Sequence, residues 1–107
     1  MLPKKNRVDK KGIDILFKEG KFISSTSFTF KFLKQKFAAK QISIIAPKSV
    51  AKLAVKRNTL RRAGYAALAK HIQEFPVGIT GAFIFKKYQD DVSILENEIK
   101  NILNKIN

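Results

Sequence analysis

The sequence predicts an α+β fold, a single domain over residues 1–107 built as a two-layer α/β sandwich whose elements follow the order helix, strands, helix, strand, helix. Its length is the first reason, because 107 residues suffice for one hydrophobic core but hardly for two. Composition is the second, since a hydrophobic fraction of 45% is ordinary for a globular chain. The third is the hydrophobic period, which changes between about 3.6 and 2 residues along the chain.

The first expected element is a short amphipathic helix over 12–19. Ile13, Leu16 and Phe17 recur at i, i+3 and i+4, which places them on one face of a helix. Gly20 follows, and glycine is common just after the end of a helix. This helix therefore offers one apolar face and ends before the first strand.

Two strands are expected next. Within 22–33, Phe28, Phe30 and Phe32 occupy every second position, which is the period of a strand with one buried face. Residues 41–46 form the second candidate strand. Because the connection between the two is short, we expect them to be antiparallel neighbours in the sheet.

A long helix over about 49–73 and a buried strand over 81–86 follow, with Pro76 between them as a helix breaker. The final helix is predicted to begin at a capping box formed by Ser93 and Glu96, whose side chains can each accept a bond from a free backbone N–H. The apolar stripe of this helix consists of Leu95, Ile99, Ile102, Leu103 and Ile106.

The charge is strongly positive and unevenly distributed. The chain has 22 Lys and Arg against 8 Asp and Glu, a formal net charge of +14. Residues 1–62 hold seventeen of the cations and three of the anions, whereas residues 63–107 hold five of each. A basic half joined to a neutral half predicts that a polyanion binds on one side of the molecule.

Nucleic acid is a better candidate for this polyanion than a membrane surface. No apolar run approaches the roughly 20 residues needed to span a bilayer, and the N-terminus lacks the apolar stretch of a signal peptide. No helix combines a cationic face with bulky aromatic anchors for peripheral attachment. The chain has no cysteine, which fits a cytoplasmic location.

The cations are most concentrated within the long central helix. At about 100° per residue, one arc of this helix carries Arg57, Asn58, Arg61, Arg62 and Tyr65. Most of the opposite arc is occupied by Leu53, Leu60, Gly64, Ala67 and Leu68.

A solvated helix surface is the competing interpretation of the cationic arc. Against it, the arc uses arginine in a chain whose other cations are nearly all lysine, and the planar guanidinium suits bidentate contact with phosphate. Asn58 is a poor helix former placed in mid-helix, where its amide can contact RNA. We therefore expect this arc to bind nucleic acid.

The side chains offer little for catalysis. His71 is the only histidine, and we expect it to be packed near the end of its helix. Asp90 and Asp91 precede the last helix, where carboxylates usually serve the turn and the helix dipole. The sequence contains no nucleophile motif, phosphate-binding glycine loop or zinc spacing. We expect no catalytic residue and no metal site in this polypeptide.

Residues 54–62, Ala-Val-Lys-Arg-Asn-Thr-Leu-Arg-Arg, resemble the signature of the bacterial ribonuclease P protein subunit. The resemblance extends along nearly the whole chain, including Lys5-Asn6-Arg7-Val8 and Leu16-Phe17-Lys18-Glu19-Gly20-Lys21. It implies a left-handed crossover made by the basic helix. It also implies an accessory subunit of the ribonucleoprotein that removes the 5′ leader from precursor tRNA. In that family the RNA subunit is the catalyst and requires Mg²⁺.

The resemblance also implies site residues by position. The protein would bind ribonuclease P RNA and the 5′ leader of precursor tRNA, with no small-molecule substrate and no membrane partner. The residues implied for RNA binding are Lys48, Lys52, Lys56, Arg57, Asn58, Arg61, Arg62 and Tyr65. Those implied for the leader cleft are Ile13, Phe17 and Lys31.

The chain departs from the family pattern after Arg62. Ala63-Gly64-Tyr65-Ala66 stands where the family usually has Leu-Ile-Arg-Glu, and Gly64 should cost the helix about 1 kcal/mol relative to alanine. Tyr65 replaces an arginine and is expected to stack on a base or bond a phosphate. Ile13 and Lys31 stand where aromatic residues are usual, so leader binding is expected to depend more on charge.

Two other functions stay open on the sequence alone. One is a structural RNA-binding protein similar to a small ribosomal protein. The other is a DNA-binding regulator, although no second helix suits a helix-turn-helix pair. All three interpretations predict binding that weakens steeply with salt.

Overall fold

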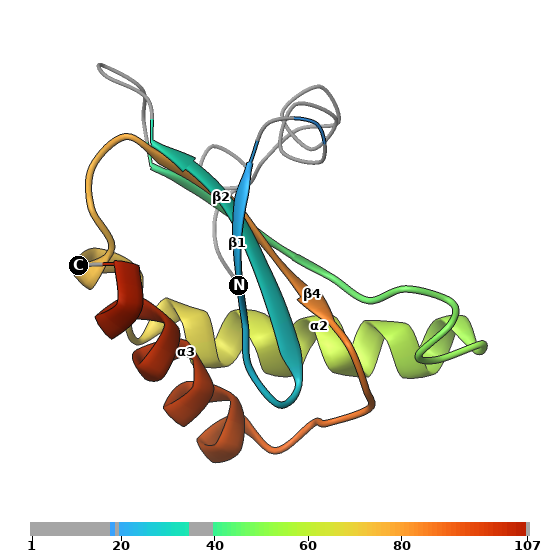
Figure 1. Cartoon of the computed structure of the whole chain (residues 1–107). Coiled ribbons are helices and arrows are strands. Elements are labelled where there is room, and N and C mark those ends of the chain that lie inside the picture. Colours follow the sequence, from blue (N-terminus) through green and yellow to red (C-terminus); the bar gives the residue numbers. More distant parts are fainter. Residues whose placement is uncertain (1–17, 19, 35–39, 107) are drawn as a thin grey trace.

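The computed structural model describes residues 18, 20–34 and 40–106 (Figure 1). One four-stranded sheet carries α2 and α3 on the same face, packed beside each other. This is the predicted two-layer α+β arrangement. The elements are β1 (Lys21–Ser24), β2 (Phe28–Lys34), β3 (Gln41–Ile45), α2 (Ala54–Ala69), the 3₁₀ helix η2 (Ile72–Glu74), β4 (Ile79–Phe85) and α3 (Val92–Ile106).

The strand order is β1-β2-β4-β3, which corrects the predicted pairing. β4 lies between β2 and β3, antiparallel to the first and parallel to the second, so the strands expected to be neighbours do not touch. Six of the seven residues of β4 are buried, and such a continuously buried strand belongs in the centre of a sheet. α2 forms the crossover that joins the parallel strands β3 and β4, and its left-handedness stays a prediction.

The stretch expected as one strand over 22–33 is a hairpin. β1 and β2 pair antiparallel, and the turn between them is closed by the N–H of Ser25 donating to the carbonyl of Phe28 over 2.8 Å. The predicted burial of Phe28, Phe30 and Phe32 is confirmed. These rings face the two helices and form the core.

Close stacking in this core depends on a glycine. The rings of Phe30 and Phe83 stack with centroids 4.2 Å apart. A Cβ atom at Gly81, in the adjacent strand β4, would lie 2.5 Å from two atoms of the Phe30 ring. Only a residue without a side chain lets Phe30 lie flat over β4.

The central helix is shorter than predicted at both ends. Before it, the N–H groups of Val50 and Ala51 both donate to the carbonyl of Pro47, which closes a turn where the sequence predicted helix. α2 begins at Ala54, so Leu53 lies just outside it and is 66% exposed rather than on an apolar arc. At the other end, the backbone tightens into η2 after the last residue of α2.

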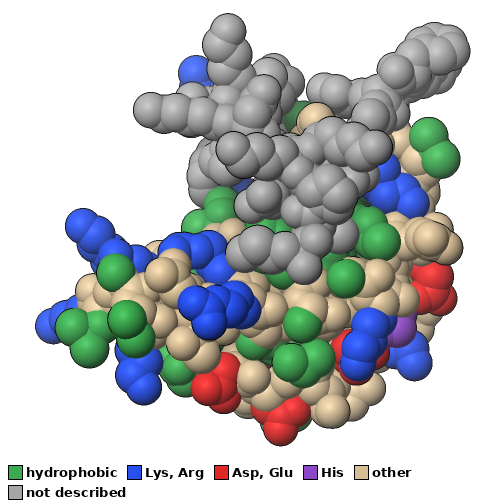
Figure 2. Space-filling model, turned by 180° about the vertical axis from the view of Figure 1, so that it is seen from behind, with side chains coloured by type: hydrophobic (Ala, Val, Ile, Leu, Met, Phe, Trp, Pro, Cys, Tyr) green, Lys and Arg blue, Asp and Glu red, His purple; other side chains and the backbone are tan. Residues whose placement is uncertain are grey.

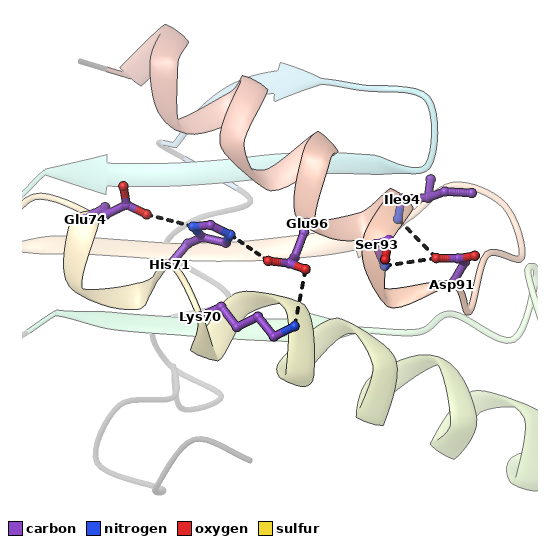
Figure 3. A network of polar contacts seen from close by, with 7 residues as sticks. All are labelled: Lys70, His71, Glu74, Asp91, Ser93, Ile94 and Glu96. Carbon is purple, nitrogen blue, oxygen red and sulfur yellow. Dashed lines mark hydrogen bonds and ion pairs between the residues drawn. The ribbon is translucent and has the colours of Figure 1, made fainter.

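The last helix begins differently from the predicted capping box. Asp91 is the cap, because its Oδ1 accepts from the N–H groups of Ser93 at 2.9 Å and Ile94 at 3.2 Å (Figure 3). Glu96 turns away from this end towards His71. The predicted turn role of Asp91 is confirmed, and the role given to Ser93 and Glu96 is wrong. The buried residues of the predicted stripe are Leu95, Ile99, Ile102 and Leu103, with Ile106 partly buried.

Candidate nucleic-acid interface

The two halves of α2 have different surroundings. Within 54–62 only Leu60 is buried, whereas five residues of the remaining seven are buried against β3 and α3. Figure 1 shows the first turns of α2 reaching beyond the strands. The cationic signature therefore lies on a helical segment that projects from the core, which we call the overhang (residues 54–62).

Gly64 allows the second half of α2 to approach the sheet closely. A Cβ atom at this position would lie 2.8 Å from Cγ2 of Ile44 on β3, which is closer than real Cβ atoms come. The glycine that weakens the helix is therefore required where the helix touches the sheet. The packing of α2 on β3 therefore explains why glycine replaces the larger residue of the family pattern at position 64.

Tyr65 is not on the exposed arc where the sequence placed it. Its side chain is 4% exposed, and its hydroxyl accepts a bond from the N–H of Ile44 over 3.3 Å. β3 is an edge strand, so this bond helps to satisfy an edge that would otherwise be open. Because its side chain is turned into the protein, we leave Tyr65 out of the candidate interface.

The other four members of the predicted arc do share one side of the overhang, and we call them the basic arc (Arg57, Asn58, Arg61 and Arg62). Arg61 donates to Oδ1 of Asn58, so the amide holds one guanidinium in place. Arg57 is half-buried, and its Nη1 donates to the carbonyls of Ala51 at 3.1 Å and Lys52 at 2.7 Å. Arg62 is exposed.

Lysines extend the positive surface around the start of α2. Lys48, Lys52 and Lys56 are exposed, and Figure 2 shows Lys and Arg side chains gathered with hydrophobic ones at this end of the molecule. The first turn of α2 has no acidic residue, and Leu53 offers no side-chain cap. The N-terminus of a helix carries the positive end of its dipole, so the lysines around it are electrostatically unfavourable. A bound anion would offset this repulsion.

The carboxylates of the described chain are all engaged elsewhere. No ion pair joins them to the basic arc or to its lysines within residues 18, 20–34 and 40–106. They lie in the turns, caps and contacts around α3, where each has a hydrogen-bond partner. The five are Glu74, Asp90, Asp91, Glu96 and Glu98. The cations of α2 are therefore left for a partner outside the described chain.

His71 is a packed residue, as predicted. It is 8% exposed and lies between two carboxylates, with Nδ1 2.7 Å from Oε2 of Glu74 and Nε2 3.0 Å from Oε1 of Glu96 (Figure 3). Lys70 reaches the other oxygen of Glu96 at 3.4 Å. The hydrogen bond with His71 is the main reason that the pKa of Glu96 lies below its ordinary value of 4.5, with Lys70 lowering it further against the opposing effect of burial. This network joins the end of α2 to α3.

The sheet face turned away from the helices forms a second candidate surface. Its register aligns Phe22, Lys31, Ala82 and Ser43 in one row across the four strands. Phe22 is 68% exposed, and Lys31 is half-buried beside it. The sequence pointed to Lys31 but missed Phe22, because β1 is too short to show an alternation of its own. Ile13 and Phe17, the other expected cleft residues, lie outside the described residues.

Two general features bear on function. In the part of the chain that the structure describes, no group of three or more His, Asp or Glu could hold a metal ion. Nor is any described helix both long and apolar enough to cross a membrane.

A sequence model of the family described as Ribonuclease P matches residues 2–107. The chain belongs to the ribonuclease P family. This membership makes it a protein component of an endoribonuclease complex of tRNA processing, whose partner is ribonuclease P RNA. No curated protein matches the chain by sequence.

Solved structures of ribonuclease P proteins share the fold. The protein from Thermotoga maritima superposes with a TM-score of 0.81 at 21% identity, covering 94% of this chain and 97% of that one. The Staphylococcus aureus protein gives a TM-score of 0.79 at 16% identity, covering 94% of each chain. A mutant of the S. aureus protein, described as defective in mRNA degradation activity, gives 0.80 at 18% identity, covering 96% of this chain and 89% of that one.

Proposed function

We propose that the chain binds ribonuclease P RNA through the basic arc of α2 and binds the 5′ leader of precursor tRNA on the sheet face turned away from α2 and α3. In this way it assists removal of the leader. The observation that carries the proposal is the basic arc itself. Its cations project from the core on the overhang, and the described carboxylates are engaged elsewhere.

The basic arc suits a folded RNA in particular. The guanidinium of Arg61 donates to the amide oxygen of Asn58. That of Arg57 donates to the carbonyls of residues 51 and 52. Both guanidinium groups are therefore partly oriented before binding. Ordering flexible side chains costs affinity, and an oriented guanidinium has less to lose. Lys48, Lys52 and Lys56 can add phosphate contacts around the same helix end.

The β1–β2 part of this sheet face suits a single strand. Phe22 offers an exposed ring for stacking on a base, and Lys31 beside it offers a charge for the backbone. Ala82 and Ser43, the next residues in the row, are buried, so the exposed part of this face lies at β1 and β2. In this proposal the RNA subunit supplies the catalysis and holds the Mg²⁺ it requires, and the chain contributes binding.

Reconstitution with a bacterial ribonuclease P RNA tests the RNA contact. We expect Arg61→Ala combined with Arg62→Ala to slow cleavage of precursor tRNA at low Mg²⁺ by tenfold or more, because charge-assisted contacts are each worth about 1.5–3 kcal/mol. Lys100→Ala is the matched control, since it removes an exposed cation from α3. Unchanged cleavage by the double variant, with its fold intact by circular dichroism, would contradict the proposal.

Copurification distinguishes the proposal from the two alternatives. We expect the tagged chain to be recovered from cells with a large structured noncoding RNA. Recovery with ribosomal RNA alone would favour a ribosomal protein. Preference for duplex DNA over structured RNA would favour a DNA-binding regulator.

A further inference from the structure

A shallow cavity of about 380 Å³ lies at the start of α2, beside the segment that follows β4. We propose that it holds one unpaired nucleotide of ribonuclease P RNA, with the base against Leu53 and Tyr88 and the phosphate near Lys52 and Lys56. This inference rests on the proposed function and adds a specific subsite to it. The remaining lining residues are Val50 and Ala51.

The cavity combines exposed apolar surface with positive charge. Leu53 is 66% exposed and Tyr88 is 40% exposed, and both belong to the lining. Single exposed apolar residues are common on protein surfaces, but here two of them share one hollow with two lysines. Nζ of Lys56 lies 6.0 Å from the centroid of the Tyr88 ring, within the range of a cation–π contact. Ring and charge are therefore held side by side.

A nucleotide matches this combination better than other ligands. Its base has an aromatic face for Tyr88 and Leu53, and its phosphate is an anion for the lysines. The volume falls within the range of about 300–1,000 Å³ that is usual for small-molecule sites. An apolar peptide would bury the lysines without a counter-charge, because none of the lining residues is acidic.

The nucleotide must be unpaired, because a base inside a duplex is stacked on both sides and cannot offer its face to a ring. The hydroxyl of Tyr88 donates to Oδ2 of Asp90 over 3.4 Å, which orients the ring from its far edge. Asp90 itself does not line the cavity, so the charged residues of the lining are the two lysines.

The position of the cavity favours ribonuclease P RNA over the leader as the source. Arg57, a member of the basic arc, donates to the carbonyls of Ala51 and Lys52, and both of these residues line the cavity. The basic arc and the cavity are thus parts of one surface at the start of α2. The row containing Phe22 lies on the sheet face turned away from both helices.

The test measures 2′-hydroxyl acylation along ribonuclease P RNA with and without the protein. We expect wild type and Tyr88→Phe to protect one unpaired nucleotide that Tyr88→Ala leaves reactive, with the rest of the footprint unchanged. Affinity for the RNA should fall about 5- to 100-fold for Tyr88→Ala, which corresponds to losing one base–aromatic stack. Leu53→Ser, a change at an exposed residue, should act in the same direction.

Val77→Ala is the matched control, because Val77 is an 86% exposed apolar residue outside the cavity. Unchanged reactivity and affinity for both Tyr88→Ala and Leu53→Ser would overturn the inference. The proposed function would survive that result if Arg61→Ala with Arg62→Ala still weakened binding, and it would fail with the inference if that variant bound normally. The same measurement is repeated on precursor tRNA in the assembled complex, and a nucleotide of the leader whose protection is lost in Tyr88→Ala would overturn the assignment to ribonuclease P RNA.

Discussion

Ile44 receives two neighbours from a single turn of α2, and together they explain an unusual piece of sequence. Its Cγ2 would lie 2.8 Å from a Cβ at Gly64, and its N–H donates to the hydroxyl of Tyr65. The glycine allows the approach, and the approach brings the hydroxyl within reach of the edge strand. Gly64 and Tyr65 are thus adapted to packing rather than exposed on the basic arc.

Replacing Gly64 tests this at the scale of one residue. Gly64→Ala should lower the free energy of unfolding by about 1 kcal/mol, because overpacking against a β-branched side chain outweighs a gain in helix propensity of about 1 kcal/mol. Chemical denaturation measures the change. Ile44→Ala in the same chain should reverse the sign of the effect of Gly64→Ala, and a stabilising single substitution would show that the contact is relaxed.

At the scale of elements, one buried carboxylate ties the hairpin to the last helix. Oε1 of Glu98 on α3 accepts from Oγ of Ser25 at 2.5 Å and from the N–H of Ser27 at 2.6 Å, within the β1–β2 turn. Glu98 is 8% exposed, so these bonds lie away from water. Because β1 carries Phe22, the position of the proposed stacking ring depends on this contact.

Glu98→Ala should therefore destabilise the protein by about 2–4 kcal/mol, since it leaves a buried N–H without its acceptor. Glu98→Gln should cost less, because it keeps the accepting oxygen. Thermal unfolding gives the global loss, and hydrogen exchange should show faster opening at β1 than at β4. Asn97→Ala, on the exposed side of α3, is the control. Equal protection of β1 and β4 in Glu98→Ala would contradict a local stabilisation of the hairpin by Glu98.

The contact between α2 and α3 should make stability depend on pH. The pKa of Glu96 is lowered in the folded protein, chiefly by the bond with His71, so its contribution is complete above the ordinary value of 4.5. As the pH falls below 4.5, the unfolded chain takes up the proton first and the stabilisation is lost. We expect Glu96→Gln to unfold less steeply with acid than wild type in denaturant titrations from pH 6 to about 3. Parallel curves for wild type and Glu96→Gln would exclude this role.

At the scale of the whole molecule, the separation of charge has a structural basis. The carboxylates after residue 73 are used to hold α3, the hairpin turn and the end of α2 together. The cations of α2 remain outside these contacts. The charges around α3 are thus balanced by contacts within the protein, whereas the overhang of α2 carries an excess of positive charge.

This separation predicts a steep salt dependence of RNA binding. The logarithm of the association constant should fall linearly with the logarithm of salt concentration, because each phosphate contact releases counterions. Arg61→Ala with Arg62→Ala should flatten that slope by about one to two units in filter binding. Lys100→Ala with Lys105→Ala removes as many charges from α3 and should change it little. Equal flattening by both pairs would mean that net charge, rather than the basic arc, sets the affinity.

Local patterns in the sequence predicted much of the fold. The alternation of Phe28, Phe30 and Phe32 and the stripe of α3 identified buried faces correctly, because such periods depend on neighbours along the chain. These local patterns did not predict the strand order, because the central position of β4 depends on pairing between segments that are distant in the sequence. The basic arc was found, but Tyr65 was misplaced. The helical period assigns one buried face to the whole of α2. In the structure, only the second half of α2 is packed, and there the buried surface extends to Tyr65.

The overhang has a thermodynamic consequence for the free protein. Leu60 is the only buried side chain between residues 54 and 62 and belongs to the same core as the phenylalanines, so the helical turn before it can unwind while Leu60 stays packed. Its helical order is then an equilibrium of its own, and under the proposed function RNA would bind the ordered fraction. Part of the intrinsic binding free energy is spent on winding this segment, so substitutions that change only its helix propensity will alter affinity without touching the RNA.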